Sequence, residues 1–403
     1  MIKMEKPAIE GGKPVRKEYL PYGFHWISED DAAFVSKSLL SGWITGGPAI
    51  EEFEEALAKY VGCKHVILVN SGTAALEIAV KAVTSPNKKI ITTPLTFVAS
   101  ANSILYNNST PIFADIEAPT FNISPAAIID QISRAKGGGV EAILPVHFAG
   151  QPCKMDEINA IANEHKLKVI EDAAHALGAE YKGKKIGSFG SEATCFSFHP
   201  VKHITTGEGG AIATNNEDIA HQAKLLRNHG LDKSSQQRNS STASYAYDVV
   251  ALGRNFRVTD FQARLGLVQL KKLDSFIKRR NEIAKFYLKE LADTPWLTLP
   301  HVEQEVRHAW HIFVIKLNLH KLRVNRDKIF AALRAENIGV NVHYIPVYKF
   351  TYYKDLDYNE KQTPVTEKVF ESIITLPIFP KMTREDEADV VTAVRKVLAY
   401  YAK

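Results

Sequence analysis

Short apolar runs alternate with amphipathic stretches between residues 64 and 214. The apolar runs are HVILVN, KIITTP, TPIFADI, EAILPVH, KVIED, ATCFSF and GAIAT. Among the stretches between them, TAALEIAVKAV, TFVASANSILY and MDEINAIANEH have apolar residues at helical spacing. Unbroken hydrophobic strands interleaved with helices are typical of a mostly parallel sheet that is covered on both faces. The pattern therefore predicts an α/β fold built on one large sheet.

The segment before this region predicts two helices. Residues 28–31 (SEDD) form a capping-box pattern that opens the first helix. The second helix is amphipathic, follows the turn TGGP, and runs to about Tyr60. A polar stretch at residues 233–244 (KSSQQRNSSTAS) is expected to be a surface insertion.

The region after the sheet predicts a second, smaller unit. From Asp260 a long helical pattern continues into the 280s and leads away from the sheet. The last third then contains a strand near HAWHIFVIKL, a helix near RDKIFAALRAEN and a final helix after Arg384, which suits a small α+β domain. We therefore expect a large α/β domain over residues 1–260, including the N-terminal segment, and a linking helix with a small domain over residues 261–403.

The composition excludes several classes of function. With 45% hydrophobic and 24% charged residues, the 403-residue chain is neither disordered nor fibrous. Its 50 Lys and Arg residues are scattered among 45 Asp and Glu residues, which argues against a nucleic-acid partner. No apolar run approaches the ~18 residues that span a bilayer, and the N-terminus is charged where a signal peptide is apolar. We expect a cytoplasmic protein with no membrane partner.

The cysteines and histidines give no sign of a metal site. Cys63, Cys153 and Cys195 lie far apart in the sequence and form no CxxC pair. The 14 histidines are not grouped with these cysteines at ligand spacing. Reduced thiols and no bound metal are therefore expected.

The residues that end the apolar runs are the first place to look for chemistry, because ligands of open α/β sheets sit beyond the carboxyl ends of the strands. The run HVILVN is followed by SGTAAL, in which Gly72, Thr73 and Ala74 open a helix. Free N–H groups and the positive helix end make this a candidate phosphate site, with the Thr73 hydroxyl as a further donor. A plain helix cap by Ser or Thr is the alternative.

Two later run ends carry ionisable groups. KVIED ends at Asp172, and a carboxylate there can hold a proton on a heterocyclic nitrogen or merely cap the next helix. SFHPVK ends at Lys202, before the segment TTGEGG. A lysine among apolar and small residues loses its proton easily, as an imine-forming amine requires, whereas most lysines are surface charges.

The order of these three features favours the chemical interpretation of each. A phosphate-binding helix start, an acidic residue at a later strand end and a lysine before a glycine-rich segment follow one another in the chain. An enzyme that uses pyridoxal phosphate must grip that cofactor at its phosphate, its ring nitrogen and its aldehyde. The succession therefore predicts a pyridoxal-phosphate enzyme.

The motifs along nearly the whole chain resemble the DegT-type sugar aminotransferase family, whose members are fold-type I pyridoxal-phosphate enzymes. The similarity is carried by GGKPVRKEYLPYG, SGWITGGP, SGTAAL, TPLTFVASAN, PVHFAGQPC, IEDAAHALGA, FSFHPVKHITTGEGGAI, GRNFRVTDFQARLGL and VNVHYIPVY. It implies an aspartate aminotransferase-like fold with a large sheet domain and a smaller C-terminal α+β domain. Within the family the chain most resembles the pseudaminic-acid-pathway branch, which aminates C4 of UDP-4-keto-6-deoxy-N-acetylhexosamines.

The resemblance assigns roles to individual residues of the cofactor site. Lys202 matches the lysine that forms an imine with pyridoxal phosphate, Asp172 the partner of the ring nitrogen, and His175 the residue beside the ring and its phenolic oxygen. Phosphate contacts match Gly72, Thr73, Ala74 and Ser197. Phe97 matches an aromatic that stacks on the ring; a core phenylalanine at a strand–helix junction is the alternative.

Further matches imply a homodimer and a sugar pocket. Asn255 matches an asparagine that reaches the cofactor phosphate of the neighbouring subunit, so active sites would be shared. Segments lining the nucleotide-sugar pocket match Tyr22, Ile44, Thr45, Gly46, Gly47, His343, Tyr344, Ile345 and Pro346; a turn and a strand end are the plain alternatives.

The implied reaction moves an amino group from L-glutamate to a UDP-linked keto-sugar and releases 2-oxoglutarate. Amination of another keto-sugar is the main alternative: a UDP-4-keto-pentose, a GDP-4-keto-6-deoxymannose, a dTDP-sugar or a 3-keto sugar. A dehydratase of the same fold has histidine in place of the imine lysine, so Lys202 argues against it. A sensor without turnover is disfavoured by the intact set of cofactor residues.

Overall fold

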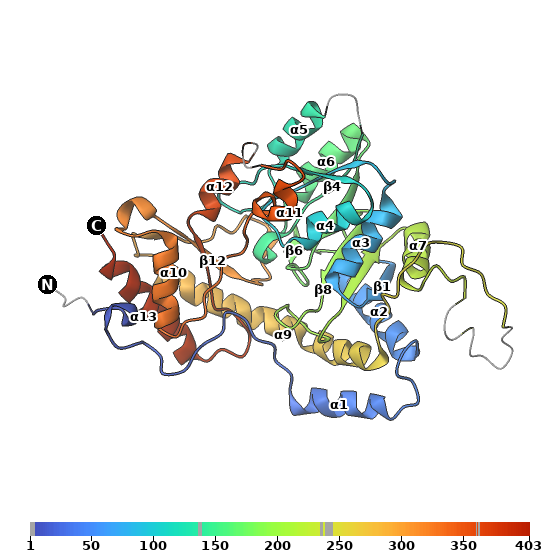
Figure 1. The fold of residues 1–403 in the computed structure, drawn as a ribbon. Coiled ribbons are helices and arrows are strands. Elements are labelled where there is room, and N and C mark those ends of the chain that lie inside the picture. The colour runs from blue at the N-terminus through green and yellow to red at the C-terminus, as the bar shows by residue number, and fades with distance from the viewer. Residues whose placement is uncertain (1–4, 136–138, 234–236, 238–244, 360, 362) are drawn as a thin grey trace.

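The computed structural model describes residues 5–135, 139–233, 237, 245–359, 361 and 363–403 (Figure 1). Its centre is a seven-stranded sheet in the order β1-β9-β8-β5-β4-β2-β3. All seven apolar runs of the sequence form these strands: β1 (His65–Val69), β2 (Lys89–Thr92), β3 (Thr110–Phe113), β4 (Val140–Leu144), β5 (Lys168–Asp172), β8 (Ala193–Ser197) and β9 (Gly210–Thr214). Strand β9 runs antiparallel to β1 and β8, and the remaining pairs are parallel. The predicted mostly parallel sheet is thus confirmed.

Successive strand residues point to opposite sides of the sheet, so unbroken apolar strands give it two apolar faces. Helices cover both faces. Val66 and Leu68 of β1 pack with α2 and α9, whereas Ile67 and Val69 pack with α3 and α7. The first face carries α2 (Pro48–Val61), α5 (Pro125–Arg134), α6 (Met155–His165) and α9 (Asp260–Glu290). The second carries α3 (Gly72–Val83), α4 (Ala99–Tyr106) and α7 (Glu217–Arg227).

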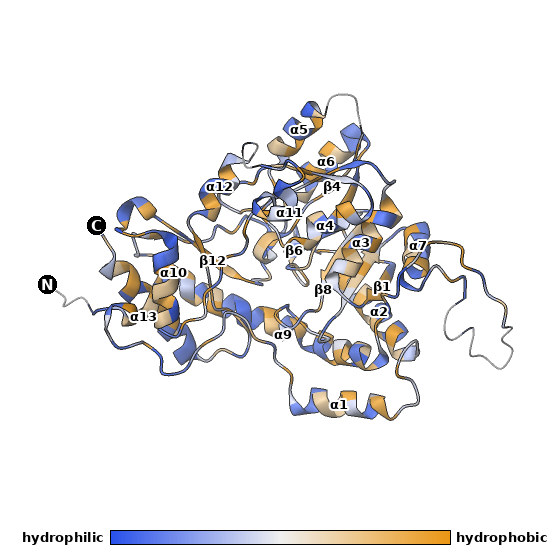
Figure 2. Ribbon diagram, in the orientation of Figure 1, coloured by the Kyte–Doolittle hydropathy of each residue, from blue (hydrophilic) through white to orange (hydrophobic). Residues whose placement is uncertain are grey.

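The hydropathy of the elements agrees with these positions. Figure 2 shows hydrophobic colour over the central strands and mixed colours along the surface helices. Within the ranges given above, no helix combines the length and the apolar character needed to cross a membrane. Of the polar stretch 233–244, all but Lys233 and Gln237 lies outside the described residues.

Helix α9 links the large sheet to a second unit. It begins with a capping box between Thr259 and Gln262 and continues to Glu290, as its sequence pattern predicted. The second unit is an antiparallel sheet in the order β10-β12-β13 that packs against the end of α9, α10 and α13. These elements are β10 (Leu297–Thr298), β12 (Phe313–Leu317), α10 (Arg326–Ala335), β13 (Ile373–Leu376) and α13 (Arg384–Tyr400).

Short elements complete the fold. Helix α1 (Glu29–Leu39) packs on α9, and Ser28 and Asp31 form the predicted capping box at its start. Three two-residue strands, which the apolar pattern did not predict, form a small sheet in the order β11-β6-β7. The remaining elements are η1 (Ala8–Glu10), η2 (Phe148–Gly150), β6 (Glu180–Tyr181), β7 (Lys184–Lys185), β11 (Val306–Arg307), η3 (Leu319–Lys321), η4 (Val347–Lys349), α11 (Thr351–Lys354) and α12 (Pro364–Phe370).

The N-terminal segment is anchored on the C-terminal unit. The fully buried carboxylate of Glu336 accepts the N–H groups of Ala8 and Val15 at 2.7 and 2.8 Å. It also pairs with the Lys396 ammonium at 3.0 Å. The division of the chain into two domains at residue 260 remains a proposal. The contacts of Glu336 attach the N-terminal segment to the unit that follows this boundary.

We expect Glu336→Ala to lower the free energy of unfolding by about 3 kcal/mol. The variant leaves two backbone N–H groups without their acceptor and removes the carboxylate that pairs with the Lys396 ammonium. Urea unfolding followed by circular dichroism measures the change. Glu164→Ala, on the exposed side of α6, is the control and should change stability by less than about 0.5 kcal/mol. Equally small changes in both variants would contradict the anchoring role.

Candidate active site

A cavity of about 600 Å³ lies at the carboxyl ends of β5 and β8, against residues 341–345 of the C-terminal unit. Parallel strands end at the same edge of a sheet, which is why residues far apart in the sequence meet here. The predicted residues that line it are Tyr22, Gly72, Thr73, Phe97, Asp172, His175, Ser197, Lys202, His343, Tyr344 and Ile345.

The start of α3 forms one end of the cavity. Ser71 is the N-cap, and its hydroxyl accepts the N–H of Ala74 at 3.0 Å. The N–H groups of Gly72 and Thr73 occupy the first two helical positions and have no intrahelical acceptor, so they are available to an anion. A Cβ on Gly72 would lie 2.8 Å from the Cβ of Ser197, so glycine allows the helix start to approach the end of β8. Ala74 itself is buried, and its amide is taken by the cap.

Asp172 lies at the base of the cavity with its carboxylate fixed by two donors. The Ser100 hydroxyl donates to Oδ2 at 2.6 Å, and the Ala174 N–H donates to Oδ1 at 3.1 Å. Ser100 also shares a hydrogen bond of 2.7 Å with the Thr96 hydroxyl. These contacts orient a carboxylate that is only 5% exposed. Ser100 was not among the predicted site residues; the hydroxyls four residues apart in TFVAS were the only sign of it in the sequence.

Lys202 projects an amine into the same cavity. Burial lowers the pKa of Lys202 to about 8, while the negative charge of Asp172 acts in the opposite direction. The Nζ atom lies 3.5 Å from Nε2 of His311, which was not among the predicted site residues. A lysine with this lowered pKa is neutral far more often near neutral pH than an ordinary lysine, and the neutral amine is the form that attacks a carbonyl.

Aromatic and imidazole rings form the remaining wall. His175 is buried, and a hydrogen bond of 2.9 Å joins its Nε2 to the Tyr344 hydroxyl. Burial, followed by the positive charge of Lys202, lowers the pKa of His175 well below its ordinary value, so the ring is neutral. Phe97 is 57% exposed, with its ring centroid 6.1 Å from that of Tyr344. It is therefore not a core phenylalanine, and its face is open to a ligand.

Several predicted residues are not at this cavity. Pro346 is buried beside it, whereas Ile44, Thr45 and Asn255 are exposed elsewhere. Gly46 and Gly47 line a second cavity of about 610 Å³. Within a single chain, the turn at residues 44–47 therefore lies away from the cavity that holds the predicted cofactor residues.

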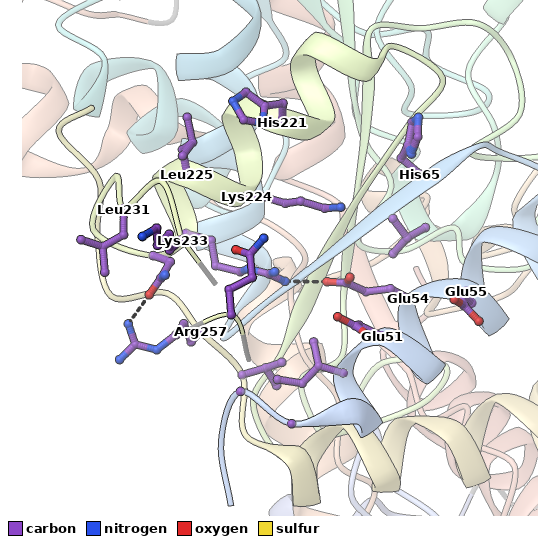
Figure 3. Close-up of a pocket in the computed structure, with 18 of the residues that line it drawn as sticks. Glu51, Glu54, Glu55, His65, His221, Lys224, Leu225, Leu231, Lys233 and Arg257 are labelled. Carbon is purple, nitrogen blue, oxygen red and sulfur yellow. Dashed lines mark hydrogen bonds and ion pairs between the residues drawn. The ribbon is translucent and has the colours of Figure 1, made fainter. Parts of the chain in front are cut away.

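The second cavity is lined by charged groups of both signs (Figure 3). Glu51, Glu54 and Glu55 of α2 lie on one side, and His221 and Lys224 of α7 on the other. At its centre, Glu54 forms an ion pair with Arg227. Arg257 donates to the side chain of Asn228 at 2.7 Å, and Asn228 forms a backbone bridge with Asn255. The predicted subunit-bridging Asn255 therefore lies on the surface next to this cavity.

The first cavity has a suitable group for each of the three parts of pyridoxal phosphate that must be held: the phosphate, the ring nitrogen and the aldehyde. Free amides at the start of α3 suit a phosphate, the fixed Asp172 carboxylate suits a protonated ring nitrogen, and the Lys202 amine suits an aldehyde. The buried Nδ1 of His175 has no hydrogen-bond partner among the described residues, and a polar atom of a bound ligand would satisfy it. Fold and cavity together define a fold-type I pyridoxal-phosphate enzyme.

The particular family follows from comparison with known proteins. Residues 26–395 match the DegT/DnrJ/EryC1/StrS aminotransferase family, and the chain belongs to it. The spore coat polysaccharide biosynthesis protein SpsC of Bacillus subtilis is 42% identical over 386 residues, which cover 95% of this chain and 98% of SpsC. The predicted family is confirmed.

Solved structures support the same assignment. Helicobacter pylori PseC, an aminotransferase involved in the biosynthesis of pseudaminic acid, matches with a TM-score of 0.87 and 31% identity, covering 96% of this chain and all of that one. Spr1654 of Streptococcus pneumoniae, described as a sugar aminotransferase, matches with a TM-score of 0.87 and 29% identity over 95% of this chain and 100% of its own. It is known in pyridoxal-phosphate and pyridoxamine-phosphate forms. The cofactor is therefore pyridoxal phosphate, as predicted.

The lowered pKa of Lys202 predicts how the cofactor-free protein reacts with pyridoxal phosphate. The bond-forming rate should rise with pH to about 8 and then level off, because only the neutral amine attacks the aldehyde. An ordinary lysine, with a pKa of ~10.4, would continue to gain about tenfold per pH unit beyond this point. Stopped-flow absorbance measures the rate, and Lys202→Ala gives the background from surface lysines. A wild-type rate that still climbs between pH 9 and 10 would contradict the prediction.

Proposed function

We propose that this protein transfers the amino group of L-glutamate to C4 of a UDP-4-keto-6-deoxy-N-acetylhexosamine and gives a UDP-4-amino-4,6-dideoxy sugar. The observation that carries the chemistry is the meeting of Lys202, Asp172 and the α3 start in one cavity. The similarity to PseC, together with the motifs SFHPVKHITTGEGG and GVNVHYIPV, supports the choice of sugar.

The chain's residues divide the work of the reaction. When bound, pyridoxal phosphate supplies an aldehyde carbon that bonds amines and a ring that takes up the electron pair released from a Cα–H bond. Lys202 would hold this carbon through Nζ, and its free amine would move the proton from the donor Cα to that carbon. Asp172 keeps a proton on the ring nitrogen, which makes the ring an effective acceptor of that electron pair. The same groups act in reverse on the keto-sugar.

The binding residues are assigned by position. Gly72, Thr73 and Ser197 hold the phosphate, whereas Ala74 would have to release its bond to Ser71 to join them. Phe97 stacks on the ring face at the open side of the cavity. The sugar nucleotide occupies the part of the cavity lined by Tyr22, His343, Tyr344 and Ile345, with Pro346 behind them.

A second copy of the chain completes the site in this proposal. Asn255 is exposed and forms a backbone bridge with Asn228, which lines the second cavity together with Arg257, Gly46 and Gly47. If Asn255 reaches the partner's phosphate site, the turn at residues 44–47 is carried toward the partner's cavity with it. The homodimer thus accounts for predicted substrate residues that lie away from the cavity of their own chain.

The substrate assignment is tested with a panel of keto-sugar nucleotides. Purified holoenzyme is given L-glutamate with each UDP-, GDP- and dTDP-linked keto-sugar, and 2-oxoglutarate release is followed. We expect the UDP-4-keto-6-deoxy-N-acetylhexosamine to give a kcat/KM at least ~10-fold above every other substrate, a difference of about 1.4 kcal/mol in transition-state binding. Lys202→Ala should release none. If a GDP- or dTDP-sugar is the best substrate, the proposed UDP-sugar assignment is wrong.

Subunit mixing tests the shared site. Lys202→Ala and Asn255→Ala homodimers should each be nearly inactive. Random pairing makes about half of the dimers mixed, each with one intact site, so activity should recover to about a quarter of wild type. Differently tagged subunits show by affinity capture that mixed dimers form. If mixed dimers form but activity does not recover, the shared site is contradicted. Lys202 and Asn255 then belong to one site within the same chain, or Asn255 is not part of the site.

A further inference from the structure

His311, on the segment that leads into β12, is fixed by its backbone. Its N–H donates to the Ala149 carbonyl at 2.9 Å. On the other side, its carbonyl accepts from Nη1 of Arg280 at 3.1 Å. A Cβ added to Gly150 would lie 2.9 Å from the Trp310 nitrogen and 3.1 Å from the His311 nitrogen, so glycine permits this close approach. The ring of His311 therefore projects from a rigid base.

Arg280 supports this base from α9. Its side chain is only 1% exposed, and Nη1 also donates to the carbonyls of Trp310 and Ile378 at 3.0 and 2.9 Å. A buried guanidinium is costly unless several acceptors satisfy it. Here the acceptors are backbone carbonyls, which join the linking helix to the segment carrying His311.

The ring of His311 lies among other buried imidazoles and touches Lys202. Its centroid is 4.2 Å from that of His175 and 5.6 Å from that of His203. Nε2 lies 3.5 Å from the Lys202 amine, and Nδ1 is buried without a partner among the described residues. Burial, followed by the positive charge of Lys202, lowers the pKa of His311 well below its ordinary value, so the ring is neutral. In the described part of the chain, no group of three or more His, Cys, Asp and Glu side chains is arranged for a metal.

A purely structural histidine does not account for this contact. His308, three residues earlier on the same segment, is equally buried. Its Nδ1 accepts the Trp310 N–H at 2.8 Å, and its ring stacks on that of Trp310. The contacts of His308 thus stabilise the backbone of its own segment. The side-chain hydrogen bond of His311 instead goes to the one amine that the proposed reaction must release and recapture.

We propose that His311 is a positioning residue for Lys202, and that its Nε2 holds the amino group in the cavity whenever this amine is not bonded to the cofactor. The inference rests on the proposed role of Lys202. A lysine side chain is long and flexible, so a freed amine would otherwise explore many rotamers. A neutral imidazole can accept from the amine or donate to it, and it adds no positive charge beside it.

The test compares His311→Asn with His311→Gln. The Gln amide can reach the position of Nε2, whereas the shorter Asn amide reaches only that of Nδ1. We expect Asn to slow two steps about 10- to 100-fold: the bonding of pyridoxal phosphate to the cofactor-free protein, and the single half-reaction with L-glutamate. Both are followed by the visible absorbance of the bound cofactor. KM for glutamate should change less than about twofold, and Gln should restore most of both rates.

Controls separate this idea from the proposed function. His308→Leu removes an equally buried histidine of the same segment and should leave both rates within about threefold of wild type. If His311→Asn does not fold, as judged by circular dichroism, His311→Leu takes its place. Borohydride reduction and peptide mass must show the cofactor fixed on Lys202 in wild type; if they do not, the proposed function fails. If fixation is normal and the His311 variant is as fast as the His308 variant, only the role of His311 is overturned.

Discussion

The parallel pairing of β5 with β8 is the constraint on which the rest of the site depends. It sets Asp172 opposite Cys195, two residues before the end of β8 at Ser197. The chain then needs only a short turn to place Lys202 beside the carboxylate. The two groups differ in sign and in task, and the sheet holds both at one edge. The energy for their burial comes from the apolar strands beneath them.

Much of this arrangement could be predicted from the sequence because it depends on local pattern. Apolar runs identified all seven strands of the large sheet, and the run ends led to Asp172 and to the segment carrying Ser197 and Lys202. A capping-box pattern placed the start of α1, and the helical pattern from Asp260 placed α9. The two-residue strands β6, β7 and β11 were not predicted, because pairs of this length leave no periodic trace.

The missed residues depend on tertiary contacts. Ser100 belongs to a helix and His311 to a loop, and neither position reveals by spacing that it touches Asp172 or Lys202. Ala74 shows a related limit. A helix start that could bind phosphate and a plain serine cap have the same sequence, and the structure has features of both: Ser71 takes one amide, and two remain free. Family resemblance assigned the turn at residues 44–47 to a pocket without indicating which chain that pocket belongs to.

The attachment of the first residues to the C-terminal unit has a practical consequence. Beyond the Glu336 anchor the segment continues to Tyr22, whose carbonyl accepts the Ile378 N–H at 3.1 Å and whose side chain lines the cavity. The N-terminal segment therefore contributes Tyr22 to the wall of the cavity. Removing the chain up to the start of α1 would take Tyr22 out of the cavity wall, and a protease cut before residue 22 would loosen that wall while leaving Asp172 and Lys202 in place.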